Sequence, residues 1–395
     1  MAPPPVTRPA WRASPRPAPE PDGAAPSAGA GLEVQLRARL RGGFKLEAAF
    51  QAAPGFTILF GPSGSGKTTL LQCIAGLHTP DEGRVAVGKR VLFDAERGIN
   101  VPVPARRVGY LFQDLALFPH LTVERNVRYG LARLPARERA DRTAEILKSF
   151  RIAHLRGRKP GAISGGERQR TALARALVTH PAVLLLDEPL SALDTSTKTK
   201  IIEDLRAWNA ARGIPILYVT HSAAEAFALG ERVMVLEAGA VIAQGTPQQV
   251  LSEPRHETVA QLAGFENVFD AVVLEVREEQ GTMRCRLSES AVELEVPLIW
   301  TSAGARVRIA LRAGDIMLAN RRPDGLSARN VIQGKLVSMT WQGVTVIASV
   351  EAGVKFEVHL TPSACQTLNL RPSRPVWLVI KTYSCHLVEP APVRS

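Results

Sequence analysis

The stretch Gly61-Pro-Ser-Gly-Ser-Gly-Lys67-Thr68 decides the fold of this chain. It fits the pattern GxxxxGK(S/T), in which glycines permit a tight loop whose backbone N–H groups converge on phosphate oxygens at the start of a helix. The apolar run Phe56–Phe60 before the loop predicts a strand, and the helix expected after it stops at Gly76. Lys67 would reach the β- and γ-phosphates, and the Thr68 hydroxyl would ligate Mg²⁺. A purely structural glycine-rich turn is the alternative, and the flanking strand and helix argue against it.

Two carboxylates stand at the end of a second apolar run. The segment Val183-Leu-Leu-Leu-Asp187-Glu188 predicts a buried strand that ends in two acids. Asp187 suits the Mg²⁺ shell that P-loop enzymes require, and Glu188 is placed to orient or deprotonate an attacking water. An apolar strand that ends in acids is a weak signal by itself. Together with Lys67, it indicates hydrolysis of a nucleoside triphosphate.

Residues 31–267 contain short β-rich runs that alternate with helical patterns. This alternation predicts an α/β fold with a largely parallel sheet covered on both faces. The expected strands are Phe56–Phe60, Arg107–Phe112, Val183–Leu186, Ile216–Thr220 and Val233–Leu236. The expected helices are Thr68–Ala75, Arg137–Ser149, Glu167–Thr179, Thr195–Ala211 and Ser222–Leu229.

The helical pattern disappears after about residue 268. Short alternating stretches separated by Gly and Pro predict a small all-β, barrel-like module. Its expected strands are Ala271–Val276, Arg306–Leu311, Gly334–Met339, Val344–Val350, Lys355–Leu360 and Val376–Ile380. Residues 1–30 hold nine Pro and eight Ala, so we expect them to be disordered, with an upstream start site as the alternative explanation. The length of 395 residues agrees with two or three domains.

Composition and cysteine usage exclude several classes of protein. The chain is 45% hydrophobic and 22% charged, values that exclude a wholly disordered, collagen-like or coiled-coil chain. Its apolar runs are strand-sized, well short of the ~20 residues of a membrane helix. The prolines near the N-terminus interrupt any secretory signal. The cysteines are scattered without a CxxC pair, which argues against disulfides or a cysteine zinc site and favours the reducing cytoplasm. They are Cys73, Cys285, Cys365 and Cys385.

The positive charge of the chain is concentrated in one stretch. The formal net charge is +12, and residues 125–175 hold 14 basic and four acidic residues. A nucleic-acid surface is one interpretation, but few aromatic residues are available there to stack on bases. A face near an anionic membrane and a solubilising surface are the alternatives.

Further motifs give the chain a resemblance to the ATP-binding cassette (ABC) ATPases. In chain order they are Gln113 for the Q-loop, Ser164-Gly165-Gly166-Glu167 followed by Arg168-Gln169-Arg170 for the signature loop, Ser191-Ala-Leu-Asp194 for the D-loop, and His221 for the switch histidine. Their order and approximate spacing agree with the family over residues 31–267. Ile163 and Glu167 depart mildly from the usual Leu and Gln of the signature.

The resemblance implies ATP and Mg²⁺ bound in two composite sites of a head-to-tail homodimer, because the signature loop of one subunit faces the ATP held by the other. The residues assigned to ATP are Gly61, Pro62, Ser63, Gly64, Ser65, Gly66, Lys67, Thr68, Thr69, Ser164, Gly165, Gly166, Glu167 and Asp194. The residues assigned to the metal are Thr68, Gln113 and Asp187, and those assigned to catalysis are Glu188, His221 and Gln113.

Phe44, which the resemblance assigns to adenine, and His221 each have a structural alternative. Members of the family often stack adenine on an aromatic residue upstream of the phosphate loop, and Phe44 is the candidate between residues 31 and 49. It sits close to Gly61 in the sequence, and core packing is its alternative role. His221 lies beyond an expected strand end and would contact the γ-phosphate, although a lone histidine is more often structural.

The chain also resembles the ATP-binding subunits of molybdate importers. Phe118-Pro-His-Leu-Thr-Val resembles importer ATPases whose helical subdomain docks on a permease. Ser327-Ala-Arg-Asn330-Val-Ile resembles the opening of an oligonucleotide-fold-like (OB-like) module called Mop or TOBE, found on molybdate importer ATPases. The domain limits implied are an ABC ATPase with a helical subdomain at 31–267, a β-rich connecting segment at 268–326 and a Mop/TOBE domain at 327–390.

This resemblance implies ATP-driven uptake of molybdate, with tungstate as a second oxyanion. The partners implied are two transmembrane permease subunits and an extracytoplasmic molybdate-binding protein, with no nucleic acid. The location implied is the cytoplasmic face of a bacterial inner membrane, as a peripheral subunit. Mop modules bind a tetrahedral oxyanion through hydroxyls, backbone N–H groups and a basic side chain. The candidates here are Arg329, Ser363, Lys381 and Ser384, for which an ordinary barrel surface is the alternative.

Three rival functions stay open at this point. An importer ATPase for sulfate, ferric iron or polyamine can carry a related β module. A nucleic-acid-handling ATPase would use the basic stretch and show salt-sensitive binding. A non-catalytic oxyanion sensor is hard to reconcile with intact Lys67, Asp187, Glu188 and His221.

Overall fold

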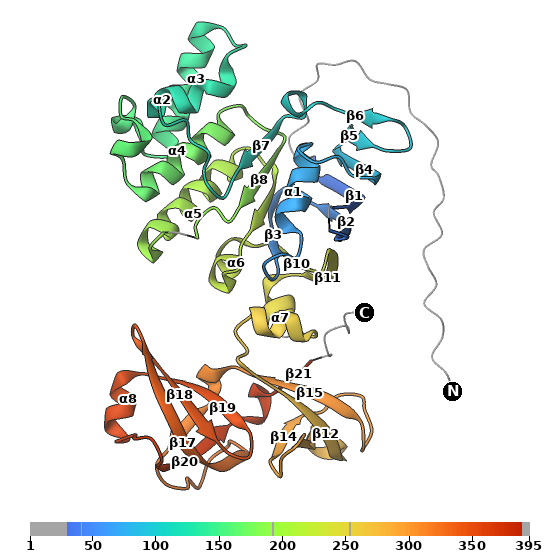
Figure 1. Ribbon diagram of the computed structural model, residues 1–395, viewed down its shortest axis with the longest axis vertical. Helices are drawn as coiled ribbons and strands as arrows, with labels where there is room; N and C mark the ends of the chain where they lie inside the picture. Colours follow the sequence, from blue (N-terminus) through green and yellow to red (C-terminus); the bar gives the residue numbers. More distant parts are fainter. Residues whose placement is uncertain (1–29, 41, 192, 253, 389–395) are drawn as a thin grey trace.

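The computed structural model describes residues 30–40, 42–191, 193–252 and 254–388. An α/β unit carries an eleven-stranded sheet, and a C-terminal unit carries two five-stranded sheets (Figure 1). The disorder expected for residues 1–30 falls, except for residue 30, outside the described residues. In the part of the chain that is described, no helix combines the length and the apolar composition required to cross a bilayer.

One half of the large sheet is parallel and matches the sequence prediction. Its strands are β3 (Gly55–Phe60), β7 (Val108–Leu111), β8 (Val183–Asp187), β9 (Pro215–Val219) and β10 (Arg232–Glu237). They pair in the order β10-β3-β9-β8-β7. Strands buried on both faces are continuous apolar runs, which is why the sequence predicts them to within one residue at each end.

The other half of the sheet is antiparallel, so the expectation of a largely parallel sheet is wrong there. Its strands are β1 (Leu32–Arg39), β2 (Lys45–Ala52), β4 (Glu82–Val87), β5 (Arg90–Asp94), β6 (Ile99–Asn100) and β11 (Ala240–Gly245). All their pairings with each other and with β10 are antiparallel except that of β11 with β2. Alternate side chains of β1 and β2 are buried and exposed, the pattern of strands with one solvated face.

Helices cover both faces of the parallel strands, as predicted. Helix α1 (Lys67–Ala75) packs on one face, in a core that includes Leu185 and Leu217. Helices α4 (Gly165–Leu177), α5 (Thr195–Ala210) and α6 (Ala223–Leu229) pack on the opposite face, in a core that includes Leu184 and Leu186. Neighbouring residues of β8 thus face different cores.

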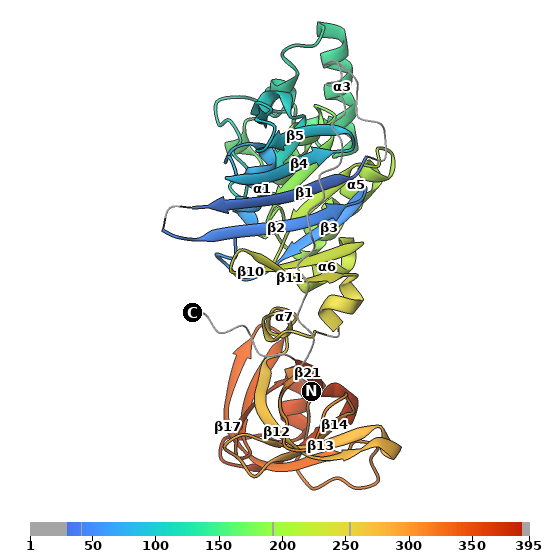
Figure 2. The same ribbon diagram turned by 90° about the vertical axis from the view of Figure 1, so that its right-hand side faces the viewer.

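The remaining helices of the α/β unit are short, apart from one. Helices α2 (Val123–Val127) and α3 (Ala136–Ser149) form with α4 the subdomain at the end of the molecule farthest from the C-terminal unit (Figures 1 and 2). Helix α7 (Glu257–Leu262) lies next to the C-terminal unit. The 3₁₀ turns of the described residues are Val103–Ala105, Arg128–Leu131, Ala153–Leu155, Pro160–Ala162, Glu278–Gln280, Ala313–Asp315 and Thr382–Ser384, and Gln248–Ser252 is a π-helical turn.

The C-terminal unit contains two antiparallel sheets, consistent with an OB-like domain. The first comprises β12 (Asn267–Arg277), β13 (Thr282–Leu287), β14 (Glu293–Pro297), β15 (Arg306–Leu311) and β21 (His386–Val388). The second comprises β16 (Met317–Ala319), β17 (Asn330–Gln342), β18 (Thr345–Glu351), β19 (Lys355–Leu360) and β20 (Pro375–Ile380), with helix α8 (Pro362–Thr367) after β19.

Strand pairing in this unit crosses the domain limit expected at residue 327. Strand β21 pairs with β15, and β16 pairs with β20. One hydrophobic core contains residues from both sides of that limit, such as Val296 and Val350. Residues 268–326 are therefore half of a folded unit rather than only a connection. Short strands that pair far along the chain leave no local signal, which is why the sequence divides this unit too early.

Two buried asparagines join the two C-terminal sheets. The Asn267 amide donates to the Glu357 carbonyl at 2.9 Å and accepts from the Glu357 N–H at 2.7 Å. The Asn330 amide makes the same pair of bonds with the backbone of Glu295, at 2.9 and 2.6 Å. Each side-chain amide thus satisfies the N–H and the carbonyl of one residue in the other sheet, as a paired strand would.

The C-terminal unit contacts the α/β unit beside α7 (Figure 2). The Arg312 guanidinium donates to the Leu251 carbonyl at 3.1 Å and lies 4.5 Å from the centre of the Phe265 ring. His386 of β21 also packs against Phe265, with the two ring centres 4.9 Å apart. Val388 of β21 packs in the same core as the helices of the α/β unit.

Candidate nucleotide site

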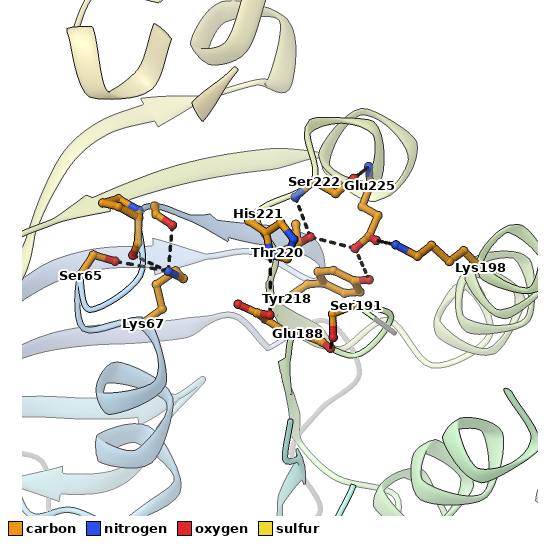
Figure 3. A network of polar contacts seen from close by, with 12 residues as sticks. Ser65, Lys67, Glu188, Ser191, Lys198, Tyr218, Thr220, His221, Ser222 and Glu225 are labelled. Atoms are coloured by element: carbon orange, nitrogen blue, oxygen red, sulfur yellow. Dashed lines mark hydrogen bonds and ion pairs between the residues drawn. The ribbon is translucent and has the colours of Figure 1, made fainter. Parts of the chain in front are cut away.

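The phosphate loop between β3 and α1 has the conformation that its glycines predict. Gly61 and Gly66 have φ angles of +153° and +102°. A side chain at Gly61 would collide with the Leu236 carbonyl, and one at Gly66 would lie 3.1 Å from the Phe44 ring. The Lys67 ammonium group donates to the carbonyls of Gly61 at 2.9 Å and Pro62 at 2.8 Å (Figure 3). The lysine is thus held over the loop.

Four strands bring their functional residues to one edge of the sheet. The parallel strands β3, β7, β8 and β9 end there, and a predicted motif follows within two residues of the end of each strand. The phosphate loop follows β3, and Glu188 follows β8. His221 lies two residues beyond the end of β9, and the exposed Gln113 lies two residues beyond the end of β7. Parallel pairing is therefore what assembles the site.

At this edge of the sheet, burial and the neighbouring polar groups shift the pKa values of Lys67 and Asp187 in opposite directions. Burial lowers the pKa of Lys67, while the carboxylates of Glu188 and Asp187 act to raise it. Burial likewise raises the pKa of Asp187, and the nearby Thr68 hydroxyl acts in the opposite direction. A hydroxyl beside a carboxylate is a donor set of hard oxygen atoms, which suits Mg²⁺. These residues therefore fit the metal that the phosphate loop implies.

Glu188 and His221 face each other across the ends of β8 and β9. The Nδ1 atom of His221 lies 3.6 Å from Oε2 of Glu188 (Figure 3). Glu188 has a φ angle of +45°, and its N–H donates to the Val219 carbonyl at 3.1 Å. A left-handed conformation at a residue with a side chain is strained and is concentrated at functional sites. The backbone thus turns this carboxylate toward the histidine.

The signature loop begins helix α4. Ser164 caps the helix: its hydroxyl accepts from the Glu167 N–H at 3.3 Å, and the Glu167 carboxylate accepts from the Ser164 N–H at 2.7 Å. These bonds lower the pKa of Glu167. The departure from the usual Gln at position 167 is therefore compatible with the loop, because Glu completes the capping box.

A surface cavity of about 440 Å³ lies against this loop and the start of α5. Asp194 caps α5 by accepting from the Thr197 N–H at 3.0 Å. The cavity is lined by Ser164, Gly165, Gly166, Glu167, Arg170, Leu193, Asp194, Thr197 and Lys200. None of these residues belongs to the phosphate loop. Within one chain, the signature loop and the D-loop are brought together, and the phosphate loop is not part of their cavity.

Phe44 packs against the phosphate loop. Its ring would contact any side chain at Gly66, and it borders the core that contains α1. The ring is half-buried. Both the adenine role and the packing role predicted for Phe44 are compatible with this position.

The candidate oxyanion residues do not all converge within the chain. Arg329 and Lys381 lie next to the paired ends of β17 and β20, and Ser384 ends the short turn after Lys381. Ser363 lies on α8, which follows the end of β19 nearest the β17–β18 hairpin. That hairpin is at the far end of β17 from Arg329. Three of the four candidates are thus at one end and Ser363 is at the other.

The sequence analysis missed several buried polar residues that support the site. Arg106, which is 1% exposed, donates to the carbonyls of Cys73 at 3.1 Å and Ile74 at 2.8 Å and so holds the end of α1. Glu225, four residues after His221 in the sequence, is also buried. Its signal in the sequence is the spacing Ser222-x-x-Glu225, which is typical of a capped helix start.

The fold and this site define an ABC-type ATPase: a phosphate loop on a parallel sheet, with a capped signature loop on a helical subdomain. The family described as "ABC transporter" matches residues 49–191. A molybdenum import ATP-binding protein ModC from Mesorhizobium japonicum is 40% identical, over 89% of this chain and 95% of the relative. The ModC protein of Rhizobium meliloti is also 40% identical, over 89% of this chain and 98% of its own length.

The solved structures agree on the fold of the α/β unit. CbiO1 from Clostridium perfringens, described as part of the ABC transporter complex cbiONQ, is 28% identical and superimposes with a TM-score of 0.50. The match covers 60% of this chain and 94% of that chain. The chain belongs to the ABC transporter family and, within it, to the ModC proteins.

Proposed function

We propose that this chain is the ATP-binding subunit of a molybdate importer and hydrolyses ATP to power uptake. The observation that carries the choice of molybdate is the extent of the similarity: it covers 89% of the chain, more than the α/β unit alone provides. The carboxyl edge of the parallel strands supports ATP hydrolysis, because it gathers Lys67, Asp187, Glu188 and His221.

Each of these residues has a distinct role in the proposal. Lys67 and the backbone N–H groups of the phosphate loop bind the β- and γ-phosphates. Glu188 orients the attacking water and accepts its proton. His221, beside Glu188, would contact the γ-phosphate. Gln113 would contribute a ligand to the metal and help to orient the water. Thr68 and Asp187 would hold Mg²⁺, which supplies neutralisation of the phosphate charge.

The signature loop would complete the site of a second copy. The N–H groups of Gly165 and Gly166 stand at the start of α4, where the helix dipole favours an anion. The adjoining cavity of about 440 Å³ is open to the surface and contains no residue of the same chain's phosphate loop. We therefore propose a head-to-tail homodimer with two ATP sites, in which Ser164 and Asp194 face the partner's nucleotide.

The importer would need partners that the chain does not provide. Two transmembrane permease subunits would dock on the subdomain of α2, α3 and α4, and an extracytoplasmic protein would deliver the oxyanion. In this proposal the chain lies on the cytoplasmic face of the membrane. In the C-terminal unit, Arg329, Lys381 and Ser384 would contribute to an oxyanion site, with Ser363 supplied from a second chain if it takes part.

The test is ATP hydrolysis by the full chain assembled with its permease in proteoliposomes. The solute-binding protein is added empty, loaded with molybdate, or loaded with tungstate or sulfate. We expect molybdate to stimulate hydrolysis and sulfate to leave it at the basal rate. Tungstate, a tetrahedral dianion of the same charge, is expected to stimulate as molybdate does.

Three results would contradict the proposal in different ways. Equal or greater stimulation by sulfate would retain the ATPase and refute the choice of substrate. Stimulation by DNA, lost as salt is raised, would favour a nucleic-acid-handling enzyme. No hydrolysis under any of these conditions would leave an oxyanion sensor as the better description.

A further inference from the structure

Glu225 is a buried carboxylate that the reaction described above does not use. It lies in the first turn of α6 and is 6% exposed. Three side chains donate to it: the hydroxyl of Tyr218 at 2.9 Å, the hydroxyl of Thr220 at 2.8 Å and the ammonium group of Lys198 at 3.0 Å (Figure 3). A carboxylate with three donors, two of them from the buried residues Tyr218 and Thr220, is fixed in position, because losing any of them would leave a polar group unpaired.

The bond from Thr220 and two further hydrogen bonds of Ser222 hold the turn that carries His221. The Thr220 hydroxyl donates to Glu225 and accepts from the Ser222 N–H at 3.0 Å. The Ser222 hydroxyl in turn accepts from the Glu225 N–H at 3.3 Å. Residues 220, 222 and 225 are therefore joined by hydrogen bonds around the turn, and the backbone of His221 lies between residues 220 and 222 while its ring points away toward Glu188 (Figure 3).

The histidine needs such support because its own side chain is poorly packed. The His221 side chain is 64% exposed, whereas that of Glu188 opposite is 23% exposed. An exposed ring is positioned by its backbone rather than by contacts around it, and a functional side chain is held in place by the residues that support it. The orientation of the ring toward Glu188 thus depends on the turn.

The third donor connects this turn to helix α5. Lys198 lies in the first turn of α5, and its N–H donates to the carbonyl of Asp194, the residue that caps the helix. Further along the same helix, the buried Asp204 accepts from Arg170 of α4. Helix α5 is thus joined by ion pairs to the turn of His221 on one side and to the helix of the signature loop on the other.

We propose that Glu225 is a positioning residue for His221 and that its ion pair with Lys198 couples the histidine to α5, the helix that Asp194 caps. This inference rests on the proposed function, in which His221 contacts the γ-phosphate. Glu225 acts only through His221, so its loss should slow turnover and leave ATP binding intact.

The test compares kcat, KM and nucleotide affinity among variants of the full chain in the importer complex. Glu225→Gln keeps the shape of the side chain and removes its charge. We expect kcat to fall about 10- to 100-fold, as is common when a supporting residue is lost. The affinity for a fluorescent ATP analogue should change by less than about twofold.

A double variant separates positioning from general damage to the fold. If Glu225 acts through His221, Glu225→Gln combined with His221→Ala should be no slower than His221→Ala alone. Multiplying losses in the double variant would overturn the proposal. So would an unchanged kcat in His221→Ala, a result that would still leave the ATPase itself in place. An inactive wild-type chain would instead refute the proposed function.

Two threonines provide a matched comparison. Thr220 and Thr258 are both buried, and each donates its hydroxyl to a glutamate at 2.8 Å. Thr220→Val should lower kcat, whereas Thr258→Val, next to Glu237, should leave kcat at the wild-type value. An equal loss in both variants would show that any such hydrogen bond matters and would overturn the proposal.

Lys198→Met provides the second variant if Glu225→Gln does not fold. The Lys198 side chain is 25% exposed, so its removal disturbs the interior less than a change at Glu225. We expect a smaller fall in kcat, again absent when His221→Ala is already present. A kcat equal to that of the wild type would overturn the coupling to α5.

Discussion

Glu188, the proposed catalytic base, has a strained backbone conformation. Its left-handed conformation costs free energy that a glycine in the same place would not cost. The strain is offset by the N–H bond to Val219 and by the buried strand before it. The strained backbone directs this carboxylate away from the end of β8 and toward His221.

Replacement of this carboxylate should separate binding from turnover. In Glu188→Gln the side chain keeps its size but no longer accepts a proton, so we expect kcat to fall by about 10²- to 10⁴-fold with ATP binding retained. Steady-state hydrolysis and retention of labelled ATP are the measurements. Glu203→Gln, at an exposed position of α5, is the matched control and should behave as the wild type. Wild-type turnover in Glu188→Gln would refute the assignment of the base.

The cysteines should make the stability of the chain fall at high pH. Burial raises the pKa of Cys73 and of Cys385 to about 12 and that of Cys285 to about 11. In the unfolded chain a thiol has a pKa of about 8.5, so ionisation there favours unfolding. The contribution of each thiol is complete below about pH 8.5 and is lost as the pH rises toward its folded value.

The measurement is the free energy of unfolding in denaturant between pH 7 and pH 11. We expect a decline above about pH 8.5 that is smaller in the conservative variant Cys73→Ala. In the folded chain at pH 8, all four buried thiols should resist alkylation. Rapid alkylation without unfolding would contradict this account.

At the scale of elements, helix α4 begins at the signature loop and, near its other end, stabilises the segment after Gln113 through Arg175. The Arg175 guanidinium donates to the carbonyls of Leu115 and Ala116, both at 2.6 Å, and lies 5.5 Å from the centre of the Phe118 ring. Leu115 and Ala116 have φ angles of +61° and +43°. One side chain therefore stabilises two successive strained residues of the segment that follows Gln113.

Loss of this side chain should release the segment. Arg175→Met keeps the apolar stem and leaves two carbonyls without their donor, so we expect a loss of about 1–3 kcal/mol in the free energy of unfolding. Hydrogen exchange should rise at residues 113–118 and stay unchanged in β8. Arg168→Met, exposed on the same helix, is the control and should be neutral. Equal exchange in both variants would contradict the proposed role of Arg175.

The strands of the α/β unit show which parts of the fold could be predicted from sequence patterns. Strands β3, β8 and β9 could be predicted because burial on both faces makes them uniformly apolar, and the motifs after them could be placed because parallel strands end at one edge. The alternating run in β1 is a clear signal that the prediction of a parallel sheet overlooked. The hydrogen bonds that Lys198, Tyr218 and Thr220 donate to Glu225 could not be predicted, because they depend on which side chains meet after folding.

At the scale of the whole molecule, Asn267 and Asn330 hold the C-terminal sheets together. Each replaces backbone pairing, so Asn267→Ala or Asn330→Ala leaves a part-buried N–H and a part-buried carbonyl without a partner. We expect each to lower the stability of this unit by about 1–3 kcal/mol. Their sites lie on different strands, so the double variant should show an approximately additive loss.

Thermal unfolding and limited proteolysis test this prediction. Cleavage should begin in the C-terminal unit while the α/β unit stays intact. Asn320→Ala, at an exposed position between β16 and β17, should have no effect. Unaltered stability in both single variants would mean that water replaces the amide bonds without cost.

The pairing of β21 with β15 has a consequence for how the protein is made. Strands β12 to β15 are synthesised before the rest of the C-terminal unit. The edge strand of their sheet, β21, is synthesised only after β17 to β20. During that interval the edge of β15 is open and can pair with another nascent chain. The phosphate loop and its partner strands are by then already available to fold. Translation speed over the last part of the message should therefore affect the yield of the C-terminal unit more than that of the ATPase.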